Sequence, residues 1–265
     1  MAKPPTTGYA PVNGLDMYWE SRGGGGVPLI VVHGGFGVTS MFGDLLDRLA
    51  ERREVFAVEL QGHGHTRDID RPFSYEAFGD DLAGLVEHLD LGQADLLGYS
   101  LGGGASLRCA IQHPDLVRRV TLVSAAHRRD AWYPEVLAAM GQINGAAFDM
   151  LSRSPLYEEW SKVAPEGASF PALMDRTGEL LRRPYDWTDE VKDLAMPTLL
   201  VYADADSIPA AQVAEFFALL GGGQRDAGWD GSLAPTNHLA VLPGLTHYNI
   251  FTSPQLLPIV EAFIG

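Results

Sequence analysis

The stretch Gly98-Tyr99-Ser100-Leu101-Gly102 reads G-x-S-x-G and decides the fold. It directly follows an apolar run that ends at Leu97 and directly precedes a segment of helical periodicity. A serine between glycines at such a junction is typical of a sharp strand-to-helix turn, because small neighbours relieve the crowding of a strained backbone. Ser100 is therefore the candidate nucleophile. The amide of Leu101 starts the helix and can stabilise a developing oxyanion.

Short runs of branched apolar residues recur on both sides of this turn. They predict buried strands at residues 27–33, 54–60, 94–98, 119–124, 197–203 and 238–243. Helical periodicity alternates with them at residues 41–51, 75–89, 102–113, 210–220 and 253–263. Residues 8–22 have hairpin character around Asn13-Gly14. The alternation predicts an α/β fold with a mostly parallel sheet covered by helices on both faces.

Residues 128–190 break this alternation, because they lie between two predicted strands and contain no convincing strand of their own. We expect a helical cap insertion here, in a core formed by residues 1–127 and 191–265. Pockets form preferentially where two packed units meet, so a few aromatic residues are expected to line a cleft beneath the cap. The candidate pocket residues are Phe36, His127, Trp132, Tyr133 and Trp160.

Composition narrows the range of partners. The chain of 265 residues has a formal net charge of −15, which disfavours nucleic acids and anionic membrane surfaces as partners. Cys109 is the single cysteine, so neither an intrachain disulfide nor a thiolate metal site can form. No leader-like apolar segment is present in the first residues, and we expect a cytoplasmic protein without a cofactor. The sequence leaves open whether two copies of the chain form a homodimer.

The segment His33-Gly34-Gly35-Phe36-Gly37 follows the first predicted buried strand. An exposed backbone N–H in this turn could complete an oxyanion hole opposite Leu101, and Gly35 is the preferred donor. Phe36 is more suited to presenting its ring to a substrate. We expect His33 to hold the loop by hydrogen bonds.

Three segments together resemble the α/β-hydrolase superfamily over nearly the whole chain: HGGFG at 33–37, GYSLGG at 98–103 and QGHGHT at 61–66. The resemblance implies the α/β-hydrolase fold and the chain order nucleophile, acid, histidine. Asp206 and His247 each follow the end of a predicted strand, where open α/β sheets place their active sites. His247 is then the general base and Asp206 orients it.

Asp204 is the rival acid. Family members that this chain resembles generally read G-x-x-D at this place, with the last carboxylate catalytic, and here Ala203 replaces the glycine. We rank Asp206 first. The rival histidines are His113, His127 and His238.

Glu59, His63 and His65 lie close together in the sequence and invite a metal interpretation. No recognised ligand spacing accompanies them, and we assign no metal.

The predicted activity is that of a serine hydrolase which cleaves a small-molecule carboxylic ester through an acyl-enzyme. The aromatic cap favours an apolar or aromatic acyl group. A serine at the turn argues against haloalkane dehalogenase and epoxide hydrolase chemistry, whose resembling members use an aspartate. Alternatives are a carbon–carbon bond hydrolase, a perhydrolase and a proline iminopeptidase, although the iminopeptidase motif usually has proline where Phe36 stands. Outside the enzymes, a small-molecule receptor with a slow triad is the alternative.

Overall fold

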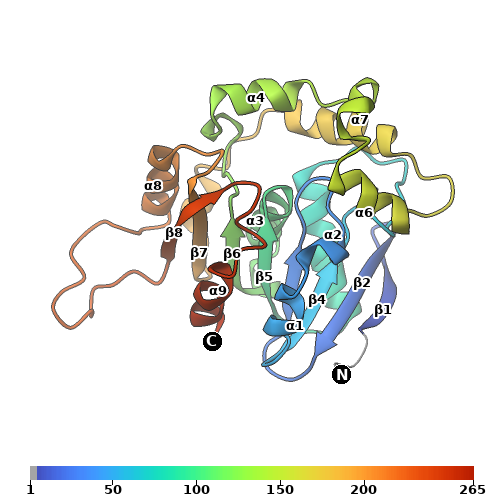
Figure 1. Cartoon of the computed structure of the whole chain (residues 1–265). Helices are drawn as coiled ribbons and strands as arrows, with labels where there is room; N and C mark the ends of the chain where they lie inside the picture. Colours follow the sequence, from blue (N-terminus) through green and yellow to red (C-terminus); the bar gives the residue numbers. More distant parts are fainter. Residues whose placement is uncertain (1–4) are drawn as a thin grey trace.

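The computed structural model describes residues 5–265, which form one eight-stranded sheet in the order β1-β2-β4-β3-β5-β6-β7-β8 (Figure 1). The strands β3 to β8 run parallel, and β1 and β2 join antiparallel at one side, which confirms the predicted mostly parallel sheet. The strands are β1 (Thr6–Val12), β2 (Leu15–Gly23), β3 (Leu29–Val32), β4 (Glu54–Val58), β5 (Ala94–Tyr99), β6 (Val117–Val123), β7 (Thr198–Ala205) and β8 (His238–Thr246).

Helices cover both faces of the sheet, because successive residues of a strand point to opposite sides. Val32 and Val58 pack toward α2 (Tyr75–His88), α3 (Leu101–Gln112) and α8 (Ala210–Leu219). Val31 and Val55 pack toward α1 (Leu45–Leu49) and α9 (Leu256–Ile264) on the other face. Both layers are mostly apolar, which explains the long apolar runs in the sequence.

The predicted hairpin is present as β1 and β2. Asn13 has φ 50° and Gly14 has φ 82°, so both turn residues adopt the left-handed conformation that a two-residue hairpin turn requires. Val12 pairs with Leu15 directly across the turn.

The predicted helix at residues 41–51 is wrong in its extent. A 3₁₀ turn at Thr39–Phe42 comes first, and α1 covers only Leu45–Leu49. Gly43 separates them with φ 53°, a conformation outside the helical region.

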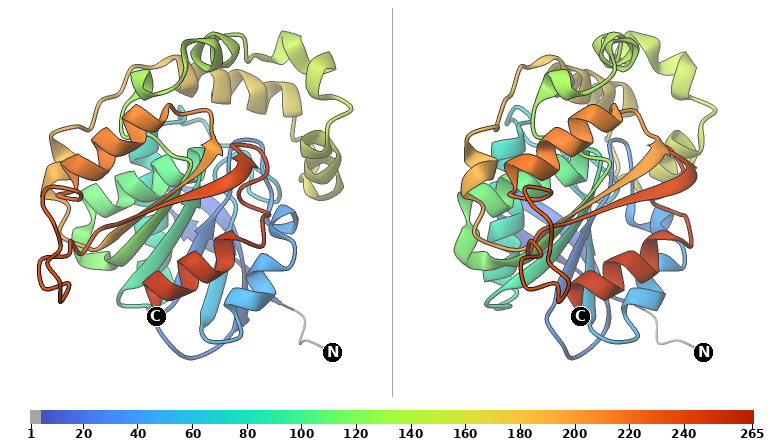
Figure 2. Two further views of the ribbon diagram at one scale, coloured as in Figure 1. Left: turned by 60° about the vertical axis from the view of Figure 1, so that its left-hand side comes forward. Right: turned by 90° about the vertical axis from the view of Figure 1, so that its left-hand side faces the viewer.

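The residues predicted as a cap form a helical layer over the carboxyl ends of the strands (Figures 1 and 2). Its helices are α4 (Pro134–Gly141), α5 (Phe148–Leu151), α6 (Pro155–Val163) and α7 (Phe170–Arg182). An antiparallel bridge between Arg128 and Asp186 joins the two ends of this segment. Its status as a separate domain stays a prediction. Within residues 5–265, no helix is long and apolar enough to cross a membrane.

The junction between β5 and α3 is the sharp turn expected from the sequence. Ser100 has φ 52° and ψ −115°, a strained conformation for a residue with a side chain. A Cβ atom on Gly102 would collide with the carbonyl oxygens of Val32 and His33, and one on Gly103 would lie 2.5 Å from the Ala125 methyl group. Only glycine at these positions lets α3 start so close to β3.

Substituting Gly102→Ala tests this close approach. The added methyl group has no room beside two backbone carbonyls, so we expect the free energy of unfolding to fall by about 1–3 kcal/mol or more. Urea unfolding followed by circular dichroism measures the change. Gly141→Ala in α4 is the matched control, since a Cβ there meets nothing within 4 Å. Equal stability of Gly102→Ala and wild type would show that the turn tolerates a side chain.

Candidate active site

The three side chains predicted as a triad come together at the carboxyl ends of neighbouring strands. Ser100 follows β5, Asp206 follows β7, and His247 follows β8. The Ser100 Oγ lies 3.1 Å from His247 Nε2, and His247 Nδ1 lies 3.1 Å from Asp206 Oδ1. Both distances lie within hydrogen-bond range. A hydroxyl, an imidazole and a carboxylate joined in this order can transfer the serine proton to the histidine.

The carboxylate of Asp206 is held from several sides. Its side chain is 1% exposed. Besides His247, its oxygens accept hydrogen bonds from the Ser124 hydroxyl at 2.5 Å, the Ala203 amide at 3.0 Å and the Ser207 amide at 2.7 Å. Burial alone would raise the pKa of Asp206, but the hydrogen bonds and the nearby imidazole outweigh it and lower the pKa below its usual value. Asp206 is thus an anion at neutral pH.

Ser124 is a contributor that the sequence reasoning missed. It directly follows β6, the strand between β5 and β7, and is fully buried with φ 51°. The unusual backbone aims its hydroxyl at Asp206 Oδ2, the oxygen that does not face His247. Its position in the sequence could have indicated this role, because Ser124 follows β6, and the two strands beside β6 are both followed by triad residues.

Three aromatic residues surround the imidazole of His247: Tyr99, Trp132 and Tyr248, whose ring centroids lie 5.3–5.5 Å from it. The Tyr99 hydroxyl donates a 2.7 Å hydrogen bond to the backbone carbonyl of His247 and fixes the loop that carries it. The Trp132 ring stands edge-on to the imidazole, with centroids 5.3 Å apart and an interplanar angle of 71°. Of the predicted pocket residues, Trp132 is thus the one in direct contact with the triad.

The two residues predicted to supply the oxyanion-hole amides, Gly35 and Leu101, lie next to each other. Gly35 lies in a turn closed by a 3.0 Å hydrogen bond from the Gly37 amide to the Gly34 carbonyl. A Cβ on Gly35 would lie 3.9 Å from Leu101 Cδ1, so the two residues are neighbours. Among the described residues, neither the Gly35 nor the Leu101 N–H has a protein acceptor. Both donors remain available to a ligand.

His33 stabilises this turn, as predicted. Its Nε2 accepts a 3.1 Å hydrogen bond from the Leu60 amide, and its Nδ1 lies 2.7 Å from the Gly34 carbonyl. This pattern requires a neutral ring with its proton on Nδ1. Burial lowers the pKa of His33 to about 3, so the ring stays neutral.

The rival acid and histidines have other partners. Asp204 is exposed and accepts hydrogen bonds from the Gly244 and Leu245 amides at 2.9 and 3.3 Å, which ties down the turn before His247. His113 lies 2.7 Å from Asp80 on the surface. His238 begins β8 and packs against Phe263 of α9.

Of the residues that invited a metal interpretation, Glu59 and His65 bind each other and the protein backbone. Glu59 is fully buried and accepts hydrogen bonds from the Thr39 amide at 2.9 Å and from the His65 amide at 2.6 Å. His65 Nδ1 lies 2.9 Å from the same carboxylate. Glu59 therefore joins the loop after β3 to the loop after β4.

Three other predicted pocket residues, Phe36, His127 and Tyr133, have different surroundings. The Phe36 ring packs against Phe170 of α7, with φ 63° at Phe36. His127 is 1% exposed and packs against Phe216, and burial lowers its pKa to about 4. Tyr133 is 38% exposed at the start of α4. Their roles in substrate binding stay predictions.

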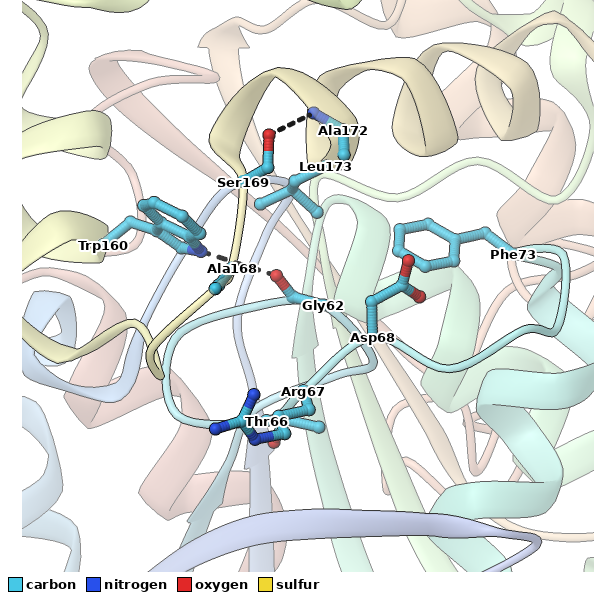
Figure 3. Close-up of a pocket in the computed structure, with 11 residues that line it drawn as sticks. Gly62, Thr66, Arg67, Asp68, Phe73, Trp160, Ala168, Ser169, Ala172 and Leu173 are labelled. Atoms are coloured by element: carbon cyan, nitrogen blue, oxygen red, sulfur yellow. Dashed lines mark hydrogen bonds between the residues drawn. The ribbon is translucent and has the colours of Figure 1, made fainter.

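Trp160 lines a cavity of about 190 Å³ between the loop after β4 and helices α6 and α7 (Figure 3). Its indole N–H donates a 3.4 Å hydrogen bond to the Gly62 carbonyl. The charged side chains of Arg67 and Asp68 line the same cavity, with Leu173 on the cap side. No triad residue lines it, so this cavity and the triad are separate features.

Comparisons with known proteins concern the family and the fold of this chain. The model of a family described as alpha/beta hydrolase fold matches residues 27–222. The 2-hydroxymuconate semialdehyde hydrolase of Pseudomonas sp. strain CF600 is 38% identical over 107 residues, which is 39% of this chain and 38% of the relative. The pimeloyl-[acyl-carrier protein] methyl ester esterase of Neisseria meningitidis serogroup B is 40% identical over 120 residues, 44% of this chain and 45% of the relative. The chain thus spans less than half the length of these curated relatives.

A solved structure of E-2-(acetamidomethylene)succinate hydrolase is similar over 98% of this chain and 99% of its own, with a TM-score of 0.78 and 23% identity. At this identity the similarity concerns the fold. It confirms the expected arrangement of sheet and helices.

Removing the Ser124 hydroxyl tests its contact with Asp206. We expect Ser124→Ala to slow the labelling of Ser100 by a fluorophosphonate about ten- to a hundredfold, because a hydrogen bond to a buried anion contributes about 1.5–3 kcal/mol. The second-order labelling rate is the measurement. Ser106→Ala is the matched control, since Ser106 is equally buried and its hydroxyl has no partner within residues 5–265. An unchanged rate in Ser124→Ala would refute the positioning role.

Proposed function

The chain belongs to the α/β-hydrolase fold family, and from this premise we propose that it is a serine hydrolase acting on a small carboxylic ester. The observation that carries the proposal is the hydrogen-bonded series Ser100, His247 and Asp206, with both links at 3.1 Å. An acyl-transfer reaction also needs hydrogen-bond donors for the oxyanion, and the backbone amides of Gly35 and Leu101 can supply them.

In the proposed reaction, His247 Nε2 takes the proton of Ser100 as the serine oxygen attacks the acyl carbonyl. The Gly35 and Leu101 amides bind the oxyanion that forms. His247 then gives its proton to the leaving alcohol, and a water molecule activated by His247 releases the acid. Oxyanion donors typically stabilise the transition state by about 2.7–4 kcal/mol each.

Asp206 has two tasks in this reaction. As an anion it stabilises the imidazolium that forms when His247 takes the proton. Its hydrogen bond to Nδ1 keeps the Nε2 lone pair of the neutral ring directed at Ser100. Ser124 and the Ala203 amide keep the carboxylate oriented for both tasks.

An ester substrate is supported by the methyl ester esterase of Neisseria meningitidis, with 40% identity over 120 residues. The apolar side of Trp132 beside His247 favours an apolar acyl or alcohol group.

A second candidate is the hydrolysis of a carbon–carbon bond. It is supported by the 38% identity over 107 residues to a hydrolase whose named substrate is 2-hydroxymuconate semialdehyde. The same nucleophile, base and oxyanion donors would serve both reactions.

Steady-state hydrolysis of p-nitrophenyl acetate, butyrate and octanoate tests the proposal. We expect turnover by the wild type and a loss of at least about a thousandfold in kcat for Ser100→Ala, because the nucleophile is removed. Ser106→Ala, which replaces another buried serine of the same segment, serves as the control. Full activity of Ser100→Ala would contradict the mechanism.

The second candidate requires a parallel assay with 2-hydroxymuconate semialdehyde. Consumption of this compound without turnover of any ester would favour carbon–carbon bond hydrolysis. Fluorophosphonate labelling of Ser100 without turnover of either substrate class would favour a receptor.

A further inference from the structure

Exposed apolar side chains gather at one edge of the sheet. Of the eight large apolar side chains that are exposed within residues 5–265, five lie between residues 229 and 248. They are Trp229, Leu233, Leu239, Val241 and Tyr248. Such a concentration on one surface is typical of an interaction site, whereas scattered exposed apolar residues need no explanation.

The edge consists of β8, whose partner in the sheet is β7. Alternate peptide groups of an edge strand point away from the sheet and have no partner. Proteins commonly protect such an edge with lysines, other charges, prolines, bulges or a covering segment. β8 contains no acid, lysine or arginine, and Pro243, the left-handed Gly244 and a register shift against β7 interrupt only its second half. Val241, just before Pro243, is 51% exposed.

The charge distribution indicates what can bind there. Residues 231–260 contain no Asp, Glu, Lys or Arg, although charged residues make up 20% of the chain and its net charge is −15. Two copies of so acidic a chain repel each other over most of their surface. β8 itself brings no like charges together, and the nearest acids in the sequence, Asp226 and Asp230, lie in the loop before this uncharged stretch.

The loop at residues 221–237 extends outward beyond the start of β8 (Figures 1 and 2). It carries Trp229, which is fully exposed, and Leu233, which is 45% exposed. A tryptophan held in solvent is an unusual surface residue and a frequent anchor at interfaces.

We propose that β8 and the loop at 221–237 form a homodimer interface. The β8 strands of two copies pair antiparallel about a two-fold axis, which satisfies the free peptide groups of both and makes one continuous sheet. The five residues 238–242 that precede Pro243 give a regular edge of about 17 Å for this pairing. In this arrangement the start of one β8 lies beside the end of the other, so Trp229 meets the region of Tyr248 of the partner subunit.

A second copy explains this surface better than a lipid surface does. Membrane-binding surfaces of peripheral proteins usually combine apolar residues with lysines and arginines that attract anionic lipids. The stretch from 231 to 260 has none of these cations. A second copy of β8, unlike a lipid surface, also pairs with an unpaired strand edge.

The molar mass in solution tests the proposal, measured by light scattering after size exclusion from low to high micromolar concentration. We expect twice the 28.7 kDa of one chain for the wild type. Val241→Glu places two carboxylates across the two-fold axis and should raise the dissociation constant at least about a hundredfold. Trp229→Ser should raise it about tenfold or more, and it leaves the sheet untouched should Val241→Glu fail to fold.

Met150→Glu is the matched control, because Met150 is 81% exposed in the cap and far from β8 in the sequence. It should keep the dimer mass. The proposal is overturned by a single-chain mass of the wild type throughout this range, or by a dimer that neither Val241→Glu nor Trp229→Ser weakens. A monomeric wild type that sediments with phosphatidylcholine vesicles would assign the surface to lipid and equally overturn it.

Discussion

The left-handed backbone of Ser100 is the constraint on which the rest of the site depends. A residue with a side chain at φ 52° is strained, at a cost of about 1–3 kcal/mol, and persists only where its surroundings fix it. Here the Ser100 amide donates a 2.9 Å hydrogen bond to the Val123 carbonyl at the end of β6, which fixes the residue after β5. Helix α3 starts at the next residue. The same turn lifts the hydroxyl toward His247 and frees the Leu101 amide.

The other components of the site follow from the order of the strands. Because β5, β6, β7 and β8 are neighbours and parallel, the residues after them meet at one edge of the sheet. Each supplies one member of the connected series: Ser100, Ser124, Asp206 and His247. Hydrophobic packing on both faces of the sheet thus determines distances between side chains that are 41 to 147 residues apart in the sequence.

Local sequence predicted those parts of the molecule that local sterics determine. The Asn13-Gly14 turn and the turn at Ser100 need residues that tolerate positive φ, so their sequence patterns indicate their structures directly. The helix expected at 41–51 failed because Gly43 interrupts it, which the periodicity of its apolar residues does not reveal. Ser124 was missed because its role depends on a contact with a residue 82 positions away.

The cap was harder to predict in detail than the sheet. Aromatic composition suggested pocket residues, but composition does not tell which ring faces a ligand and which ring packs inside the cap. Trp132 lies against His247. Trp160 packs against Phe170 and lines a cavity that no triad residue lines, and His127 packs against Phe216. Only the tertiary packing of the cap on the sheet distinguishes them.

The most direct test of the connected series compares the two neighbouring carboxylates. Asp206→Asn keeps the shape of the side chain but removes the anion that contacts His247, whereas Asp204→Asn changes a carboxylate that binds only the Gly244 and Leu245 amides. The account predicts a fall in kcat for p-nitrophenyl butyrate of about a thousandfold or more in Asp206→Asn. It predicts less than about a tenfold change in Asp204→Asn. A larger fall in kcat for Asp204→Asn than for Asp206→Asn would contradict this account.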